Sequence, residues 1–271
     1  MSPRPEHDYV RSFVRERAAI VLDENKGYLI DGRLASVCRQ HGFAGLPELV
    51  GALRADPRSP IAQVVIDALT TNETSFFRDV SYYDALRQEI LPELIERRRT
   101  QRALTIWSAA CSTGQEPYSL AMILAEQKEL EGWRIRILAT DIDETVLARA
   151  RTGEFTQLEV NRGLPARQLI AHFEKHGDVW RVKDDVRRLI TFEKRNLATR
   201  WPAHDPFDLV MLRNVLIYFD TDVRRDILHR AHAAIRPGGY LVLGGAESTI
   251  NLCDAFVRVR KGKAVLYSVA A

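Results

Sequence analysis

The sequence is poor in cysteine, has no long apolar run and carries little excess charge of either sign. Its three cysteines, Cys38, Cys111 and Cys253, are odd in number and widely separated, so they give no disulfide framework and fit a reducing compartment. No stretch approaches the roughly 18 uninterrupted apolar residues of a membrane helix, and the polar N-terminus lacks the apolar core of a signal peptide. These absences predict a cytoplasmic protein without membrane insertion.

Charge and histidine content argue against two further kinds of site. The formal net charge of +3, from 39 basic and 36 acidic residues, is too small to predict nucleic-acid binding. One basic cluster, Arg97–Arg99, is either a solvated complement to a helix dipole or a docking patch for an acidic partner. Among the seven histidines, His229 and His232 have a helical spacing that a metal could use. We interpret them as part of a solvated helix face and expect no metal.

The first part of the chain, about 90 residues, carries helical signals and no strand signal. Val10, Phe13, Val14, Arg17 and Val21 recur at helical spacing, and the next helical pattern ends at Gly42, a helix-stop residue. Two shorter amphipathic segments follow, LPELVGALRAD and SPIAQVVIDALTT. This part resembles a small helical bundle.

From about Leu104, apolar strand candidates alternate with helical stretches, which is the pattern of an α/β sheet. The last two strand candidates are close in sequence, so one of them is expected to run antiparallel at the sheet edge. We therefore expect an all-α N-terminal domain over residues 1–78 and an α/β domain over residues 79–271. The expected strands are Leu104–Ala109, Ile135–Thr140, Leu189–Lys194, Phe207–Leu212, Tyr240–Gly244 and Ala264–Val269, and the expected helices are Glu116–Gln127, Glu144–Thr152 and Thr221–Ile235.

A polar segment interrupts this alternation between Gly153 and Leu189. It is longer than a crossover helix needs, and we interpret residues 154–190 as an inserted subdomain. Within it, VWRVKDDVRRLITF is expected to form two short antiparallel strands around a turn at Asp184–Asp185.

The segment WSAACSTGQEPYSL is a candidate ligand loop. Its apolar, β-prone start breaks into a turn around Gly114 and opens a helix, and Asp141 ends a second apolar run further along the chain. This is the layout of a nucleotide-binding βαβ unit, in which the acidic side chain accepts hydrogen bonds from ribose hydroxyls. The turn has one glycine where the dinucleotide fingerprint has three, and Glu116 at the helix start would repel a phosphate. A cationic ligand without phosphate, such as S-adenosylmethionine, suits this loop.

Simpler interpretations of the same residues stay open. Glu116 is also explained as a carboxylate that complements the helix dipole, and Asp141 or Asp143 as the cap of the following helix. Cys111 is explained as a small, half-buried residue that fills a tight turn.

Two other segments place polar residues among aromatic or apolar ones. In TTNETSFFRDVSYYDAL, Asn72, Thr74 and Arg78 are interleaved with phenylalanines, so that aromatic side chains anchor a turn while its polar edge faces a cleft; the alternative is a capped interdomain loop. In FDLVMLRNVLIYFD, Arg213 and Asn214 follow an apolar strand, and the carboxyl ends of such strands are where ligands bind in open α/β sheets.

Together these segments identify a family. TTNETSFFRD, SAACSTGQEPYSLA, ATDID, RNL at Arg195–Leu197 and RNVLIYF match, in order and spacing, the characteristic blocks of the chemotaxis receptor glutamate methyltransferases. The chain resembles this family, the CheR family, along nearly its whole length. The resemblance implies a Rossmann-like S-adenosylmethionine-dependent methyltransferase domain with a small antiparallel β-subdomain, preceded by an all-α bundle.

The resemblance also implies which residues do the work. Arg78 and Tyr218 would stand near the transferred methyl group as catalytic residues. The S-adenosylmethionine site would be lined by Asn72, Thr74, Arg78, Glu116, Asp141, Asn196, Leu197, Arg213 and Asn214.

By the same resemblance, the protein transfers a methyl group to glutamate carboxylates of methyl-accepting chemotaxis receptors and leaves S-adenosylhomocysteine. Its partner would be the cytoplasmic helical bundle of the receptor, docked by the N-terminal helices. Because these helices are neutral overall, attraction to an acidic receptor depends on local arrangement, and from the sequence we name Arg33 and Arg39 as candidate contacts. Some family members also bind a receptor pentapeptide through a glycine-lengthened loop of the subdomain. Here EKHGDVWRVKDD is short and has one glycine, so we expect independence from that tether. The oligomeric state stays open.

Other functions remain to be distinguished. A non-catalytic signalling module would keep the fold and bind S-adenosylmethionine, although all the motif residues are present in this chain. A methyltransferase acting on a small molecule or a nucleic acid would share the chemistry, but the Asn-Pro-Pro-Tyr type of loop found in amino-methylating nucleic-acid enzymes is absent after Leu212.

Overall fold

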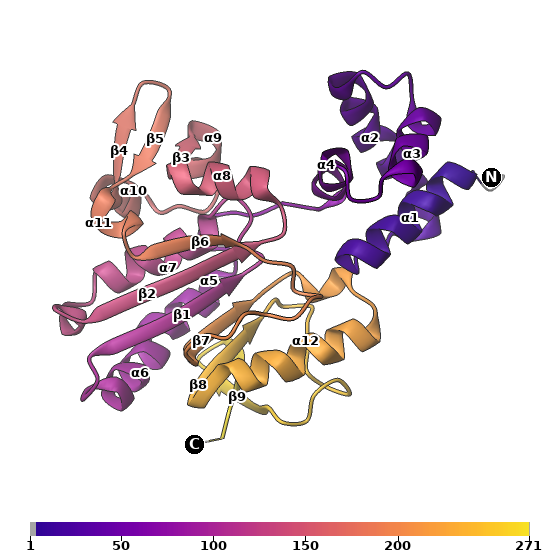
Figure 1. The fold of residues 1–271 in the computed structure, drawn as a ribbon. Coiled ribbons are helices and arrows are strands. Elements are labelled where there is room, and N and C mark those ends of the chain that lie inside the picture. Colours follow the sequence, from indigo (N-terminus) through magenta and orange to yellow (C-terminus); the bar gives the residue numbers. More distant parts are fainter. Residues whose placement is uncertain (1–3, 271) are drawn as a thin grey trace. The chain divides into compact units, whose positions relative to one another are not determined.

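The computed structural model describes residues 4–270. By their contacts these residues form two units (Figure 1). One unit holds residues 4–71 together with Tyr218–Val223, and the other holds Asn72–Ile217 together with residues 224–270. The sequence-based boundary between residues 78 and 79 stays a prediction about domains.

The N-terminal unit is built from helices, as its periodicity predicted. Val10, Phe13 and Val14 are buried on one side of the first helix, but the helix ends at Ala18, so the predicted extension of this stripe to Val21 is wrong. Gly42 ends the second helix with a φ of 78°, a conformation that glycine adopts without a Cβ clash. The helices are α1 (Pro5–Ala18), α2 (Gly27–His41), α3 (Leu46–Ala55) and α4 (Pro60–Leu69), with a short 3-10 turn at Glu24–Lys26.

The second unit contains a seven-stranded sheet in the order β6-β2-β1-β7-β8-β10-β9. The strands from β6 to β8 are parallel, and β10 runs antiparallel to both of its neighbours. This confirms the predicted α/β class and the antiparallel direction of the last predicted strand. Its predicted place at the sheet edge is wrong, because β9 lies outside β10. The strands are β1 (Ala103–Ala109), β2 (Arg134–Asp141), β6 (Ile190–Lys194), β7 (Phe207–Leu212), β8 (Ile235–Leu243), β9 (Val257–Lys261) and β10 (Ala264–Ser268).

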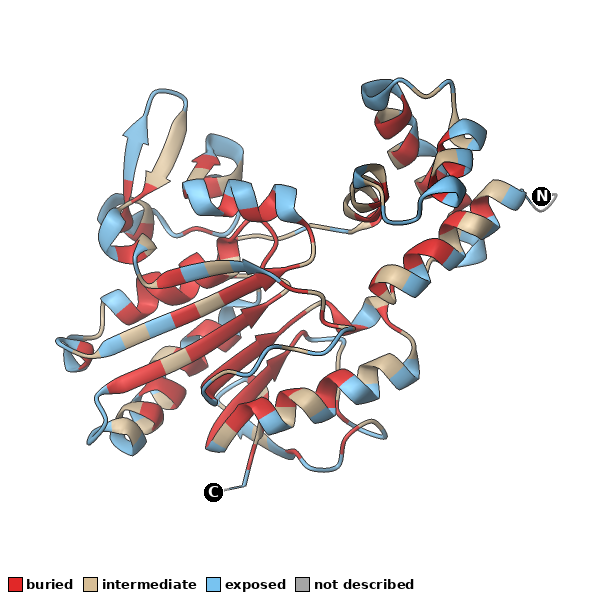
Figure 2. Cartoon of the chain, viewed as in Figure 1, coloured by how far each residue is buried: buried red, intermediate tan, exposed pale blue. Residues whose placement is uncertain are grey.

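Helices cover both faces of this sheet. In Figure 1, α5, α6 and α7 lie on one face and α12 on the other, and the central strands are mostly buried (Figure 2). Every residue of β7 is buried, as expected for a strand with helices on both faces. The helices are α5 (Val80–Ala85), continued by a π turn at Leu86–Ile90, α6 (Leu91–Arg98), α7 (Gln115–Ala125), α8 (Glu144–Thr152) and α12 (Thr221–Ala234), with short 3-10 turns at Lys128–Leu130 and Leu216–Tyr218.

Strand β9 was not predicted from the sequence, and β8 begins five residues earlier than expected. In β9, valines alternate with arginines, but both valines stay at least partly exposed because the strand lies at the sheet edge. The apolar signal of a half-buried strand is therefore weak. Charged residues on an edge strand also hinder pairing with other chains.

The insertion folds as a three-stranded antiparallel sheet in the order β3-β5-β4, as predicted in outline. The predicted turn at Asp184–Asp185 is wrong. The hairpin reverses at Gly177–Asp178, where Gly177 has a φ of 57°, while Asp184 begins a helix and ITF belongs to the main sheet. The elements are β3 (Glu154–Thr156), α9 (Gln157–Asn161), α10 (Ala166–His172), β4 (Phe173–His176), β5 (Val179–Val182) and α11 (Asp184–Arg187).

Two arginines of the basic cluster Arg97–Arg99 make contacts within the protein. Arg98 forms an ion pair with buried Asp208 at 3.3 Å, and Arg97 donates a hydrogen bond to the carbonyl of Gly238. Arg99 is the most exposed of the three and pairs with Glu96 at 3.7 Å. Arg98 is therefore neither a solvated dipole complement nor part of a docking patch, whereas Arg97 is about half exposed.

Within residues 4–270, no helix combines the length and the apolar character needed to cross a membrane.

Candidate active site at the carboxyl edge of the sheet

Six of the predicted site residues lie at or after the carboxyl ends of four adjacent parallel strands. Glu116 lies in the first turn of α7, after β1, and Asp141 ends β2. Asn196 and Leu197 come directly after β6, and Arg213 and Asn214 directly after β7. Because these strands are parallel neighbours, their carboxyl ends meet at one edge of the sheet, where open α/β sheets bind ligands.

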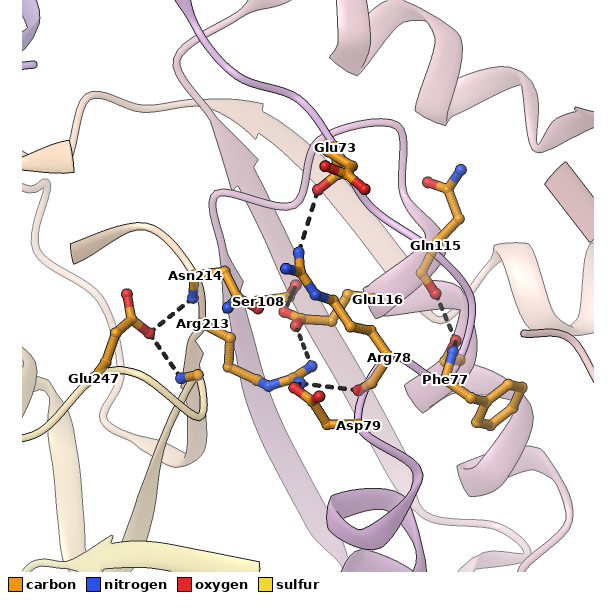
Figure 3. Close-up of polar contacts among 12 residues, drawn as sticks. Glu73, Phe77, Arg78, Asp79, Ser108, Gln115, Glu116, Arg213, Asn214 and Glu247 are labelled. Atoms are coloured by element: carbon orange, nitrogen blue, oxygen red, sulfur yellow. Dashed lines mark hydrogen bonds and ion pairs between the residues drawn. The ribbon is translucent and has the colours of Figure 1, made fainter. Parts of the chain in front are cut away.

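A buried ion pair joins the ligand loop to the segment after β7 (Figure 3). Arg213 donates from Nη1 to Glu116 Oε2 at 3.0 Å, and Ser108 Oγ donates to Glu116 Oε1 at 2.8 Å. The Arg213 guanidinium also donates to the carbonyl of Arg78 at 2.8 Å and to the carboxylate of Asp79. Three segments that are far apart in the sequence are thereby fixed around one guanidinium.

Burial and ion pairing shift the pKa values of this cluster. Desolvation raises the pKa of Glu116, while the charge of Arg213 and the Ser108 hydrogen bond oppose the rise. Burial alone would lower the pKa of Arg213, but the nearby Glu116 carboxylate raises it above its usual range. The guanidinium also lies over the rings of Tyr82 and Tyr83, at 5.4 and 6.0 Å from their centroids, which favours the cation.

The pairing refines the interpretation of Glu116. Its charge is already matched by Arg213, so it is more than a carboxylate that complements the dipole of α7. Asp79, whose side chain is half-exposed, is a second carboxylate on the same guanidinium. Two carboxylates around one guanidinium leave a net negative charge, which suits a cationic ligand and disfavours a phosphate.

Asp141 is not the cap of the following helix. Asp143 caps α8, since its Oδ1 accepts from the N–H groups of Thr145 and Val146. Asp141 Oδ2 accepts from the N–H of Ser112 at 2.8 Å, and Oδ1 accepts from the N–H of Asp143 at 3.1 Å. A carboxylate has about four acceptor positions, so both oxygens keep capacity for ligand hydroxyls. Burial raises the pKa of Asp141, and these backbone hydrogen bonds oppose the rise.

The segment from Asn72 to Arg78 is anchored on both sides. Asn72 Nδ2 donates to Asp143 at 2.7 Å, and Ser112 Oγ donates to the carbonyl of Asn72 at 2.7 Å. Phe76 is fully buried, with its ring 4.9 Å from that of Phe155. The prediction that aromatic side chains anchor this turn is confirmed, and Thr74 and Arg78 are partly exposed along it.

The backbone of the ligand loop has the positive φ angles of a glycine-rich turn, although the loop contains one glycine. Ala110, Ser112 and Gly114 all have positive φ, at 56°, 50° and 96°, a region that costs non-glycine residues about 1 kcal/mol or more. A lack of glycines here therefore does not mean a relaxed loop. Cys111, next to Ala110 and Ser112, lies in the turn as its simpler interpretation predicted, but at 1% exposed it is fully buried where half-burial was expected. Burial raises the pKa of its thiol.

The remaining predicted residues differ in their surroundings. Asn196 Oδ1 accepts from the N–H of Ala198 at 2.9 Å, and buried Leu197 accepts from Arg230 through its carbonyl at 2.7 Å. Tyr218 belongs by its contacts to the N-terminal unit, where its carbonyl accepts from the N–H of Val21 at 2.8 Å. Its role near the methyl group stays a prediction.

Three residues at this edge were missed from the sequence. Ser108 and Asp79 lie inside the recognised segments, but nothing in their spacing distinguishes them from the neighbouring polar residues. Glu247 accepts four backbone hydrogen bonds around Asn214. Its sequence signal is weak, a carboxylate shortly after Gly244 and Gly245 at the end of a strand.

The sheet order and the acidic carboxyl edge fit an S-adenosylmethionine-dependent methyltransferase, and the match of residues 72–264 to a SAM binding domain shows this class and its cofactor. Comparison with known families agrees. Residues 5–70 match the all-alpha domain of CheR methyltransferases, and residues 72–264 match their SAM binding domain. The chain therefore belongs to the CheR methyltransferase family.

Curated relatives span nearly the same length. Chemotaxis protein methyltransferase Cher2 of Pseudomonas putida is 39% identical over 262 residues, covering 95% of each chain. Chemotaxis protein methyltransferase 1 of Pseudomonas aeruginosa is 41% identical with the same coverage. Chemotaxis protein methyltransferase 1 of Vibrio cholerae is 36% identical over 273 residues, covering 99% of this chain and 98% of the relative.

Proposed function

We propose that this protein methylates glutamate side chains of chemotaxis receptors, forming glutamate methyl esters. The observation that carries the proposal is the full-length similarity to proteins named chemotaxis protein methyltransferases, at 39–41% identity over 95% of both chains. The acidic carboxyl edge supports the cofactor half of the reaction, because its net negative charge matches a sulfonium and an amino group.

Little chemistry is required of the side chains. When bound, S-adenosylmethionine supplies a methyl group on a positively charged sulfur, and a glutamate carboxylate, ionised at neutral pH, accepts it without a general base. The residues of this chain accelerate the reaction by holding both partners in line, within about 3–3.5 Å, and by excluding water.

The proposed ligand residues divide by chemistry. Asp141 would accept the ribose hydroxyls, and the Glu116–Arg213–Asp79 cluster would face the cationic end of the ligand. Asn72, Thr74, Asn196, Leu197 and Asn214 would shape the rest of the site.

Arg78 and Tyr218 are the proposed catalytic residues. The guanidinium of Arg78 donates a long 3.4 Å hydrogen bond to the carbonyl of Glu73. This weak contact leaves its charge able to attract an incoming glutamate carboxylate.

Methyl transfer to receptor-containing membranes tests this function. Label from S-adenosylmethionine should enter receptor protein and be released as methanol by alkali, which is diagnostic of a methyl ester. Label that stays bound after alkali would contradict ester formation. Label in a small-molecule fraction would favour the other methyltransferase hypothesis, and tight S-adenosylmethionine binding without transfer would favour a signalling module.

Receptor docking is proposed for the N-terminal helices, against the cytoplasmic helical bundle of the receptor. Arg39 is exposed on α2 and stays a candidate contact. Arg33 is a weaker candidate, because its guanidinium donates to the carbonyl of Thr70 at 2.9 Å and to the hydroxyl of Thr71 at 3.2 Å.

Independence from a receptor tether is also proposed. The β4–β5 hairpin reverses through the short turn at Gly177–Asp178, in place of a glycine-lengthened loop. Titration with a receptor-tail pentapeptide checks this: we expect no saturable binding, and micromolar affinity would overturn it.

A further inference from the structure

One carboxylate organises the turn that follows β7. Glu247 Oε1 accepts from the N–H groups of Val215 and Leu216, at 2.9 and 2.8 Å. Its Oε2 accepts from the N–H groups of Asn214 and Gly244, at 2.8 and 2.7 Å. Four backbone donors from two loops therefore converge on a single side chain (Figure 3 shows Glu247 beside Asn214).

This arrangement is an anion-binding nest filled by the protein itself. Successive N–H groups aim at one point when a residue among them adopts a left-handed conformation, and Asn214 has a φ of 57°. Such nests bind phosphates in other proteins. Here a carboxylate from the β8 loop occupies the position of the anion.

The two loops approach too closely for a side chain at position 244. A Cβ on Gly244 would lie 2.6 Å from Asn214 Nδ2 and 2.8 Å from Glu247 Oε2. The glycine is thus required by the same contact that the carboxylate makes. Glycine and glutamate together fix the turn.

The turn carries residues of the proposed site. Asn214 directly follows Arg213, whose guanidinium holds Glu116 and the carbonyl of Arg78. Without the carboxylate, three consecutive N–H groups would lose their acceptor, and the turn would lose the contact that sets its path.

We propose that Glu247 is a positioning residue for S-adenosylmethionine: it fills the backbone nest after β7, holds the Arg213–Asn214 turn in its binding conformation and closes this part of the edge to anionic ligands. The proposal rests on the assignment of Arg213 and Asn214 to the cofactor site. Glu247 acts through the turn and takes no part in the transfer itself.

Calorimetry with S-adenosylhomocysteine tests the positioning role directly. Glu247→Gln keeps the shape but turns an acceptor into a donor facing N–H groups, so it should raise the Kd at least tenfold, equivalent to about 1.4 kcal/mol. The matched control is Asp208→Asn, at the opposite end of β7. Asp208 is equally a brace, accepting from the N–H of Thr105 at 2.8 Å and pairing with Arg98 and Arg236.

The control should lower the melting temperature while leaving the Kd unchanged. Unchanged affinity in Glu247→Gln would overturn the proposal, as would an equal loss in Asp208→Asn, which would reduce Glu247 to a general stabiliser. Binding is measured without a receptor, so a failure of receptor methylation does not affect the result.

Chemical rescue tests the nest. In Glu247→Ala, added formate should restore part of the lost affinity by occupying the vacated position, whereas sodium chloride at the same ionic strength should not. Asp208→Ala should gain nothing in affinity from formate. Absence of rescue in a folded Glu247→Ala variant would contradict the nest.

If the alanine variant does not fold, Glu247→Asp replaces it. This residue keeps two acceptor oxygens on a side chain shorter by one methylene. It should bind S-adenosylhomocysteine more tightly than Glu247→Gln, and weaker binding than the glutamine variant would overturn the role of the negative acceptor.

Discussion

At the scale of single residues, the site is made of carboxylates that are buried and already partly engaged. Asp141 uses one oxygen for Ser112 and the other for Asp143, while Glu116 is held by Ser108 and Arg213. Such groups are rigid before a ligand arrives. Rigid acceptors lose little side-chain entropy on binding, which favours affinity.

Replacing Asp141 tests its proposed contact with the ribose. Asp141→Ala should weaken S-adenosylmethionine binding at least tenfold, about 1.4 kcal/mol, because both the ligand acceptor and the support of Ser112 are lost. Calorimetry measures the change. Thr156→Ala, which removes the cap of α9, should cost about 1 kcal/mol of stability without changing affinity. Unchanged affinity in Asp141→Ala would contradict the ribose contact and would mean that Asp141 only supports the backbone at Ser112.

The raised pKa values of Glu116 and Asp141 predict opposite pH trends for ligand binding and for stability. As pH falls through these raised pKa values, the carboxylates become neutral and affinity for the cationic ligand should fall. In the ligand-free protein the folded state holds these protons to a higher pH than the unfolded state does. The free energy of unfolding should therefore decrease as pH rises from the ordinary carboxylate pKa to the raised pKa of the folded protein.

Titration calorimetry from about pH 5 to pH 8 checks the binding trend. Glu116→Gln should bind more weakly at neutral pH and show a flatter pH profile. An unaltered profile in that variant would exclude Glu116 as a source of the pH dependence.

At the scale of elements, the ligand loop has backbone strain, because non-glycine residues in it adopt positive φ angles. Ala110→Gly should leave stability within about 0.5 kcal/mol of the parent or raise it, because relief of the positive φ offsets the greater freedom of the unfolded chain. Ala121→Gly, in the buried middle of α7, should cost about 1 kcal/mol or more. Urea denaturation compares them. Equal losses would mean that the strain at Ala110 is negligible.

The β-subdomain is in contact with the Asn72–Arg78 segment. A Cβ on Gly163 would lie 2.2 Å from the carbonyl oxygen of Phe76, and Gly163 has a φ of 88°. Gly163→Ala should therefore displace Phe76, weaken S-adenosylmethionine binding and lower stability by more than the roughly 1 kcal/mol cost of the backbone conformation alone.

Gly177→Ala is the matched control for this variant. It lies in the same subdomain, also has positive φ, and its Cβ would meet nothing within 4 Å. It should lose only the backbone contribution and keep its affinity. If both variants bind equally well, the subdomain does not set the position of the segment.

At the scale of the whole molecule, docking predicts a charge-dependent interaction with receptors. Arg39→Glu should raise the KM for receptor severalfold at low salt and less at high salt, because exposed charges are screened. Arg99→Glu, which changes an exposed arginine of the methyltransferase unit, should leave the KM unchanged. An equal effect of both variants would indicate general attraction in place of docking through α2.

Local patterns predicted most of the architecture. Strong periodicity placed the N-terminal helices, and the buried strand Phe207–Leu212 has the predicted bounds. Two elements were missed. The edge strand β9 lacks a continuous apolar face, so its sequence gives little strand signal. The hairpin turn was predicted at Asp184–Asp185, because two adjacent aspartates are a stronger turn signal than the single glycine at Gly177.

The sequence predicted the motif residues of the site but not the hydrogen bonds and ion pairs between them. The sequence placed Glu116 at the start of a helix, and Asp141 and Arg213 at strand ends. It did not show that Arg213 pairs with Glu116, 97 residues away, or that Glu247 braces Asn214, 33 residues away. Such pairings depend on which loops the fold brings together, and no spacing rule along the chain encodes them.

Cys111 has a consequence for chemical inhibition. It lies in the centre of the ligand loop, where a covalent inhibitor would be aimed, yet it is buried and its thiol stays protonated at neutral pH because burial raises its pKa. Electrophiles and peroxides react with the exposed thiolate. The loop should therefore react slowly with alkylating reagents and peroxides, and Cys111 is a poor anchor for a covalent inhibitor.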